Sequence, residues 1–314
     1  SQEGLDRGGS TAADATAPPD PREPPIRQKR AQKEVSARRR CEYNKKIHFN
    51  RPSTWSGRIG TVKNIIACRP GSYRKYSNLA FEYLPKAGIY NVEIGPPAKD
   101  EIAQTQAELR RHGLKATSLA TGCNLAKEAD VQALVQTLET ARKMDVGVIF
   151  CSTSSGGLSG KEPYTKLATL GDSAADNHTV ISMETHPDLC QNGDQMLKTM
   201  KAVKHKNVGI NFDTANIYYY NEGVDAVTEL KKIAKYVASV HLKDTNGKPK
   251  TWYFPTLGQG VVDYPKVFRI LNDLGFHGPF TMEMEGIEGE DLNLEQTQQR
   301  IVDSMSYLRR IGVI

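Results

Sequence analysis

The chain has 314 residues, of which 38% are hydrophobic and 25% are charged, a balance typical of a folded globular protein with a substantial core. It has no run of 18 or more apolar residues and no apolar segment near its N-terminus, so we expect neither a membrane span nor a secretory signal. The net charge is +6, but residues 1–50 carry 11 Lys and Arg against 7 Asp and Glu and the remainder is nearly neutral, which argues against nucleic acid as a partner of the fold itself.

Residues 1–55 are predicted to be a disordered extension, and residues 56–314 the folded domain. The first part is rich in Gly, Ala, Pro, Asp and Ser and includes PPDPREPP, which cannot form a packed element. A basic stretch follows from Arg27 to Lys46. Such a charge run is most simply a solvated tail, and the alternative is an arm for an acidic partner.

The five cysteines are widely spaced, odd in number and without a CxxC pair. This arrangement favours free thiols in a reducing compartment, so we expect a cytoplasmic protein and no zinc knuckle. The cysteines are Cys41, Cys68, Cys123, Cys151 and Cys190.

From about Arg58 onward, short apolar runs alternate with amphipathic segments, and each kind occurs eight times. The apolar runs, predicted as strands, are Val62–Cys68, Tyr90–Gly95, Lys115–Ala120, Val146–Cys151, Thr179–Glu184, Val208–Asp213, Val237–Leu242 and Phe280–Glu285. The predicted helices are 77–87, 99–112, 127–143, 161–176, 192–204, 223–235, 264–274 and 294–311.

Eight strand–helix units in a domain of this length predict an α/β fold, a (β/α)8 TIM barrel, which usually takes roughly 250 residues. The alternative is a doubly wound open sheet. That fold normally carries a Gly-rich phosphate loop after its first strand. Here the first apolar run leads into CRPGSYRKY, which has no GxGxxG pattern.

Four apolar runs carry an acidic residue or a histidine at or close to their C-terminal end: Glu184, Asp213, His241 and Glu283. In a barrel, catalytic side chains come from the C-terminal ends of the strands, and consecutive strands are neighbours. Glu184 and Asp213 are 29 residues apart, and Asp213 and His241 are 28 apart, close to one βα unit. The longer step to Glu283 contains a predicted inserted loop at 243–263. The four side chains are therefore expected to meet at one mouth of the barrel.

Three carboxylates and one imidazole in one place call for a cation, because like charges buried together are strongly unfavourable. Oxygen-rich ligation favours Mn²⁺, Mg²⁺, Co²⁺ or Fe²⁺, and Zn²⁺ is also compatible. The alternative for each of these residues is a structural ion pair with Lys or Arg.

The motifs ETHPD, NFDTAN, VHLKD and GPFTMEMEG occur in this order, and with them the segment from Lys63 to Ile314 resembles the xylose-isomerase-like TIM barrel superfamily, within its sugar phosphate isomerase/epimerase group. The resemblance implies that Glu184, Asp213, His241 and Glu283 are metal ligands. It also implies that the two glutamates move the proton in a sugar isomerase or epimerase, with a small-molecule sugar or cyclitol as substrate.

The chemistry of such a reaction fits these residue types. Isomerising or epimerising a sugar requires removal of a proton next to a carbonyl, and a metal stabilises the anionic enediolate that results. One carboxylate on each face can then take the proton from one side and return it on another.

Five further residues are candidates for substrate binding, each with a structural alternative. His186 shares a side with Glu184 in an extended backbone, or it caps a loop. Asn216 stands where epimerases of the group often have histidine, which puts the epimerase subtype in doubt. Lys243 holds a substrate oxygen or lies on the surface. Glu93 ends the second strand, where it either lines the pocket or has no contact with it. Trp252 stacks on the sugar, or it fastens the inserted loop.

Other functions are compatible with the same fold. A lyase of the superfamily, such as an inosose or dehydroshikimate dehydratase, would use the same metal and proton abstraction but expel a hydroxyl. An endonuclease-IV-like enzyme would need several metals and many histidine ligands, whereas the whole chain has seven histidines. A catalytically inactive binding module is disfavoured by the intact ligand quartet. By analogy with the family, a homo-oligomer is also compatible.

Overall fold

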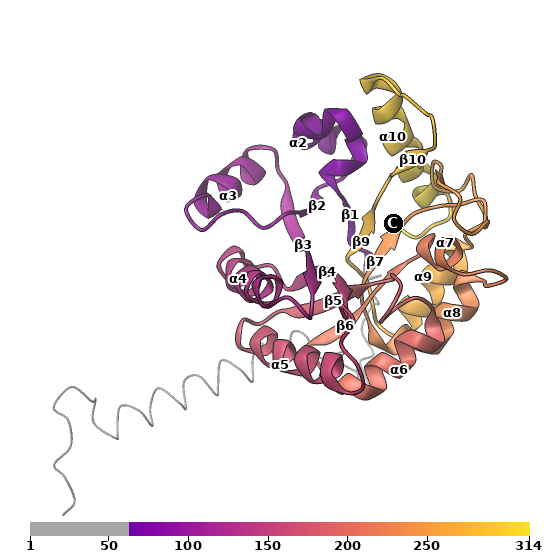
Figure 1. Ribbon diagram of the computed structural model, residues 1–314. Coiled ribbons are helices and arrows are strands. Elements are labelled where there is room, and N and C mark those ends of the chain that lie inside the picture. Colours follow the sequence, from indigo (N-terminus) through magenta and orange to yellow (C-terminus); the bar gives the residue numbers. More distant parts are fainter. Residues whose placement is uncertain (1–62) are drawn as a thin grey trace, which may run out of the picture. The chain divides into compact units, whose positions relative to one another are not determined.

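The computed structural model describes residues 63–314 (Figure 1). The predicted N-terminal extension and its boundary near residue 55 lie outside this range and stay predictions. Within the described residues, no helix is both long enough and apolar enough to cross a membrane.

Eight parallel strands close into a barrel, so the predicted (β/α)8 fold class is confirmed (Figure 1). Each barrel strand pairs with the next barrel strand along the chain, and the last, β9, pairs with β1 through Ala67 and Thr281. The barrel strands are β1 (Ile66–Cys68), β2 (Asn91–Ile94), β3 (Lys115–Asn124), β4 (Val148–Ser154), β5 (Val180–Glu184), β6 (Val208–Asp213), β7 (Val237–Leu242) and β9 (Phe280–Met282).

Helices surround this barrel (Figure 1). They are α2 (Ala80–Tyr83), α3 (Ile102–Arg111), α4 (Glu128–Met144), α5 (Glu162–Asp176), α6 (Gly193–Val203), α7 (Asn216–Tyr220), α8 (Ala226–Ile233), α9 (Tyr264–Asp273) and α10 (Leu294–Arg310), with the 3-10 helices η1 (Pro70–Leu79), η2 (Pro85–Ala87) and η3 (Ala234–Tyr236).

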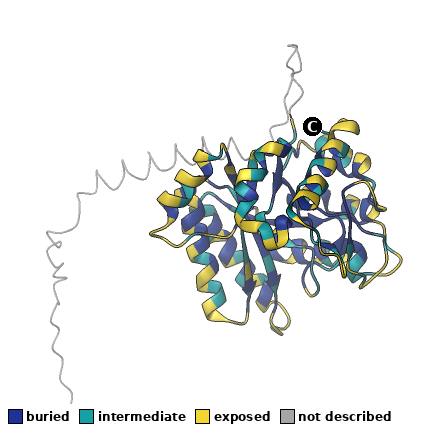
Figure 2. Ribbon diagram, turned by 90° about the horizontal axis from the view of Figure 1, so that it is seen from above, coloured by how far each residue is buried: buried dark blue, intermediate teal, exposed yellow. Residues whose placement is uncertain are grey.

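Helix α4 shows why the amphipathic pattern gives this arrangement. Leu134, Leu138 and Ala141 recur at the spacing of one helical face and are fully buried in the core. The exposed residues lie mainly on the outer faces of the helices, and the strands are mostly buried (Figure 2). Burial of one apolar face per helix therefore fixes the helices on the outside of the barrel.

The first strand–helix unit differs from the prediction of one helix at 77–87. The chain instead forms the 3-10 segment η1, the short helix α2 and then η2. Pro70 and Pro85 each begin a 3-10 segment, because proline fits the first turn of a helix but cannot continue one. Within η1, Arg74 adopts a φ of 55°, a conformation that is unusual for a residue with a side chain.

The inserted loop at 243–263 contains an element that the apolar runs did not predict. Strand β8 (Tyr253–Phe254) pairs antiparallel with β10 (Gly286–Ile287), which follows the last barrel strand. Buried Asp244 accepts backbone hydrogen bonds from Gly258 at 2.8 Å and Gly260 at 2.9 Å. A Cβ on Gly260 would lie 2.2 Å from Asp244 Oδ1, so this turn requires glycine. The loop is thus held internally by Asp244 and joined through β8 to the segment that follows the last barrel strand.

Two irregularities in strand register place polar side chains inside the barrel. The register between β2 and β3 shifts after Val92, so that Glu93 lies opposite Ser118. The register between β6 and β7 shifts in the same way and places Asn211 opposite Ser239. Both pairs are hydrogen bonded, at 2.6 and 2.7 Å. Such bulges re-aim side chains, and here the first one sets the position of Glu93.

Candidate metal centre

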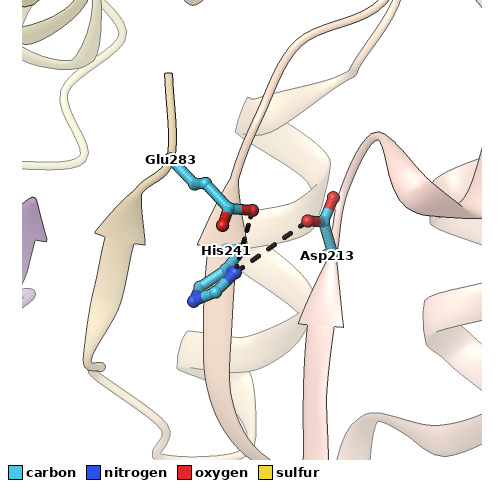
Figure 3. A group of neighbouring side chains, drawn as sticks. All are labelled: Asp213, His241 and Glu283. Atoms are coloured by element: carbon cyan, nitrogen blue, oxygen red, sulfur yellow. Dashed lines mark ion pairs between the residues drawn. The ribbon is translucent and has the colours of Figure 1, made fainter. Parts of the chain in front are cut away.

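Asp213, His241 and Glu283 bring three potential metal ligands together at the C-terminal rim of the barrel (Figure 3). One ligand atom of each residue lies within 4.8 Å of those of the other two, and all three residues are buried. The atoms that face one another are Asp213 Oδ2, His241 Nδ1 and Glu283 Oε2. Apart from ion-pair contacts with one another and with Lys243, none of them has a hydrogen-bond partner. Buried polar atoms normally have partners, so this donor set fits a divalent cation.

The backbone after β6 orients the Asp213 carboxylate. Its Oδ1 accepts hydrogen bonds from the N–H groups of Ala215 and Asn216, both at 2.9 Å. These bonds occupy one oxygen and leave Oδ2 directed at His241 and Glu283 (Figure 3). The turn after the strand therefore presents the second carboxylate oxygen at the site.

Glu93 orients His241 from the opposite side of the ring. Its Oε1 lies 2.9 Å from His241 Nε2, and its Oε2 accepts from Ser118 at 2.6 Å. The Nε2–H of the imidazole donates to this carboxylate, which leaves Nδ1 toward Asp213 and Glu283. The ring also stacks on Phe150, with centroids 4.4 Å apart. A carboxylate behind a metal-ligating histidine is the usual means of fixing its tautomer and strengthening its basicity.

The protonation of His241 is strongly affected by these neighbours. Burial by itself lowers the pKa of the imidazole, but the Glu93 and Glu283 charges outweigh it and raise the pKa of His241 to about 10. A metal that binds Nδ1 therefore displaces a proton, and its affinity is expected to rise with pH below that value.

Glu283 follows β9 by one residue and is surrounded by cations. Its Oε1 contacts the guanidinium of Arg69, and its Oε2 lies 3.2 Å from His241 Nδ1 and 2.7 Å from Lys243 Nζ. Burial opposes ionisation, but the Lys243 and His241 charges hold the pKa of this carboxyl well below its ordinary value. Glu283 is therefore an anion at neutral pH.

Glu184 lies beside these three residues but outside the group within 4.8 Å. Its Oε1 is 3.4 Å from Asn216 Nδ2. Burial raises the pKa of Glu184, and the nearby Glu283 charge adds to that effect. The pKa of Glu184 is thus raised, whereas the pKa of the neighbouring Glu283 is lowered. Opposite shifts in neighbouring carboxyl groups are typical of sites in which such groups have different roles in proton transfer.

The other predicted substrate-binding residues lie in different surroundings. Lys243 is 2% exposed, and Asn216 is buried between it and Glu184. His186 packs edge-on against Tyr220, at 4.9 Å between ring centroids. Trp252 is 38% exposed and packs against Phe254 at 5.2 Å, within the inserted loop. Trp252 therefore belongs to an aromatic cluster of that loop, while its contact with a sugar stays a prediction.

Sequence reasoning missed Arg69 and Glu285. The Arg69 guanidinium contacts Glu283, lies 3.4 Å from Glu93 and sits 5.2 Å from the Phe150 ring. Its position directly after the first apolar run was the available signal, since the other site residues also follow strands. Glu285 stands two residues after Glu283, and its Oε2 lies 2.6 Å from Lys243 Nζ.

Replacing Glu93 by Gln is expected to weaken divalent-metal binding by about 10- to 100-fold, because a neutral amide no longer increases the basicity of His241. Titration of the metal-free protein with Mn²⁺ and Zn²⁺ against a fluorescent chelator measures this effect. Glu82→Gln, on an exposed surface pair with Lys86, serves as the control. Unchanged affinity in a folded Glu93→Gln protein would show that Glu93 does not act on the metal ligand.

A model of the xylose isomerase-like TIM barrel family matches residues 81–311, most of this chain. The chain belongs to this family. The predicted resemblance is thereby confirmed. Among curated members, an inosose dehydratase from Klebsiella pneumoniae strain 342 is 25% identical over 286 aligned residues, which cover 78% of this chain and 92% of the relative.

Two solved structures of the xylose isomerase-like fold match the barrel closely. The D-psicose 3-epimerase of Clostridium cellulolyticum H10 in complex with D-tagatose has a TM-score of 0.64 at 15% identity and covers 78% of this chain and 98% of its own. The IOLI protein with a bound zinc atom has a TM-score of 0.64 at 19% identity and covers 79% and 98%. At these identities the likeness shows the fold alone.

Proposed function

We propose that this xylose isomerase-like protein is a divalent-metal-dependent isomerase or epimerase that acts on a sugar, a sugar phosphate or a cyclitol. The observation that carries the proposal is the convergence of three buried potential ligand atoms, Asp213 Oδ2, His241 Nδ1 and Glu283 Oε2. Glu184 is proposed as the fourth ligand. Mn²⁺, Mg²⁺ or Co²⁺ suits the oxygen-rich set, and Zn²⁺ is compatible with it.

The residues of the site have different roles in the proposed reaction. A divalent cation would supply a Lewis acid that polarises a substrate carbonyl. Glu184, partly exposed and with a raised pKa, takes a proton from the carbon next to that carbonyl at a carboxylate oxygen. Glu283 is the second carboxylate: after it takes up a proton from solvent, it donates that proton to the other face of the substrate. Asn216 is hydrogen bonded to Glu184 and holds it in place. Asn216, Lys243, His186 and Trp252 are proposed to bind substrate hydroxyls.

A dehydratase is the second candidate, because the inosose dehydratase relative aligns over 92% of its length. Both reactions begin with abstraction of a proton next to a carbonyl, and they differ in whether a hydroxyl then leaves. The same carboxylates and cation serve either outcome, so the product must decide between them.

The test is a panel of ketoses, ketose phosphates and inososes, incubated in D₂O with protein loaded with Mn²⁺, Mg²⁺, Co²⁺ or Zn²⁺. Deuterium at the carbon next to the carbonyl, in a product with an unchanged number of oxygens, supports the isomerase or epimerase. Loss of one water identifies a dehydratase. A metal-loaded protein that exchanges no substrate hydrogen on the whole panel would contradict both reactions.

A further inference from the structure

Lys243 occupies the same place as the expected cation. Its Nζ lies 3.1 Å from Asp213 Oδ2 and 2.7 Å from Glu283 Oε2, which are two of the three converging ligand atoms. The side chain is 3% exposed, so water cannot screen its charge. A divalent ion bound to both oxygens would lie next to the ammonium group, and two cations this close repel each other strongly in a buried site.

Two groups outside the ligand cluster also contact the ammonium group. Glu285 Oε2 lies 2.6 Å from Lys243 Nζ, and the ring of Phe254 lies 5.0 Å away. Both can attract a cation, the first as a carboxylate and the second through its ring face. Neither residue belongs to the group of three metal ligands.

The backbone around Glu285 and Phe254 is held by two sets of contacts. The carbonyl of Glu285 accepts a hydrogen bond from Arg74 Nη1 at 2.8 Å. Arg74 makes this contact from a backbone conformation with a positive φ of 55°. The next residue, Gly286, pairs with Phe254 in the two-stranded sheet of β8 and β10. Glu285 and Phe254 are therefore fixed relative to each other.

We propose that Lys243 is a built-in counterion that neutralises the ligand cluster in the metal-free protein and moves toward Glu285 and Phe254 when a divalent cation binds. Metal affinity is then set by a competition between the cation and the ammonium group. Glu285 is a positioning residue, because it acts on metal binding through Lys243. This inference rests on the proposed function, since it requires Asp213, His241 and Glu283 to bind a metal.

The first experiment replaces Lys243 by Met, which keeps the length of the side chain and removes its charge. The dissociation constants of Mn²⁺ and Zn²⁺ are measured by chelator competition, and Tm is measured with and without metal. We expect about tenfold tighter binding than wild type, on the scale of other residues that act on metal ligands. We also expect a lower Tm of the metal-free protein, because its buried carboxylates lose their counterion.

Lys232→Met is the matched control. Lys232 also bridges two carboxylates, Asp194 at 2.8 Å and Glu229 at 2.9 Å, but between α6 and α8, away from the metal ligands. Its replacement should leave both dissociation constants unchanged. Tighter binding in this control as well would show that the gain comes from net charge alone and would overturn the proposal.

The second experiment leaves Lys243 in place and changes Glu285 to Gln, alone and together with Lys243→Met. The single change should weaken metal binding about tenfold, because Lys243 then has no carboxylate to move toward. Loss of a nearby negative charge would also weaken binding directly, but that effect would persist without Lys243. We expect Glu285→Gln to have little effect in the Lys243→Met background, a coupling that the double-mutant cycle measures.

The outcomes distinguish a failure of the counterion proposal from a failure of the proposed metal site. Wild-type protein that binds neither ion would overturn both. Wild-type protein that binds metal, with equal or weaker binding in Lys243→Met or with additive effects in the double mutant, would overturn the counterion role alone. If Lys243→Met is folded only with metal bound, the same double-mutant cycle is measured with Lys243→Gln as the neutral background.

Discussion

Glu184→Gln is expected to reduce turnover by about 10²- to 10⁴-fold, because glutamine keeps the shape of the side chain but cannot accept a proton. The amide oxygen can still accept from Asn216 in the wild-type position, so the fold should be unaffected. Glu283→Gln should lose at least as much turnover, since it also weakens a metal ligand. The measurement is turnover and substrate–solvent hydrogen exchange on whichever compound of the panel is converted.

The exchange experiment assigns the roles of the two glutamates. One variant is expected to retain exchange at one face of the substrate without completing the reaction, and the other to block exchange in that direction. Glu139→Gln, on the exposed side of α4, should behave as wild type. If both site variants bind metal and keep near wild-type turnover, the two-carboxylate mechanism is wrong and another base must be sought, first His186 or Lys243.

Asp213→Asn and His241→Gln are expected to reduce the affinity for divalent metal by more than about 100-fold, beyond the effect of residues behind the ligands. The asparagine can still accept the hydrogen bonds from Ala215 and Asn216 at its Oδ1, so the turn after β6 is retained. Metal content after dialysis, measured by mass spectrometry, and chelator titration report the loss.

The pH dependence provides an internal check on His241. In wild type the affinity should rise with pH toward the metal-free pKa of about 10, because the cation competes with a proton at Nδ1. His241→Gln should lose this dependence along with most of its affinity. Full metal occupancy in both folded variants would remove Asp213 and His241 from the site.

The sequence by itself determined the fold and the rim on which the site lies. Eight apolar runs between amphipathic segments leave few alternatives to a closed parallel barrel, because each run must be covered by a helix and paired with its neighbours. Parallel strands place all their C-terminal ends on one rim. A residue that ends a run, such as Asp213 or His241, was therefore assigned to that rim from local sequence alone.

The tertiary structure decided which of these residues touch one another. Glu93 supports His241 from 148 positions away, and Arg69 reaches Glu283 across 214 positions. Local periodicity carries no information about such distances, since they depend on barrel closure and on a register shift beside Glu93. The burial of Lys243 was equally invisible, because its surroundings come from β6, β9 and a loop that a two-residue strand holds in place. Local pattern fixes the order and direction of the strands, whereas closure of the barrel fixes which charges meet.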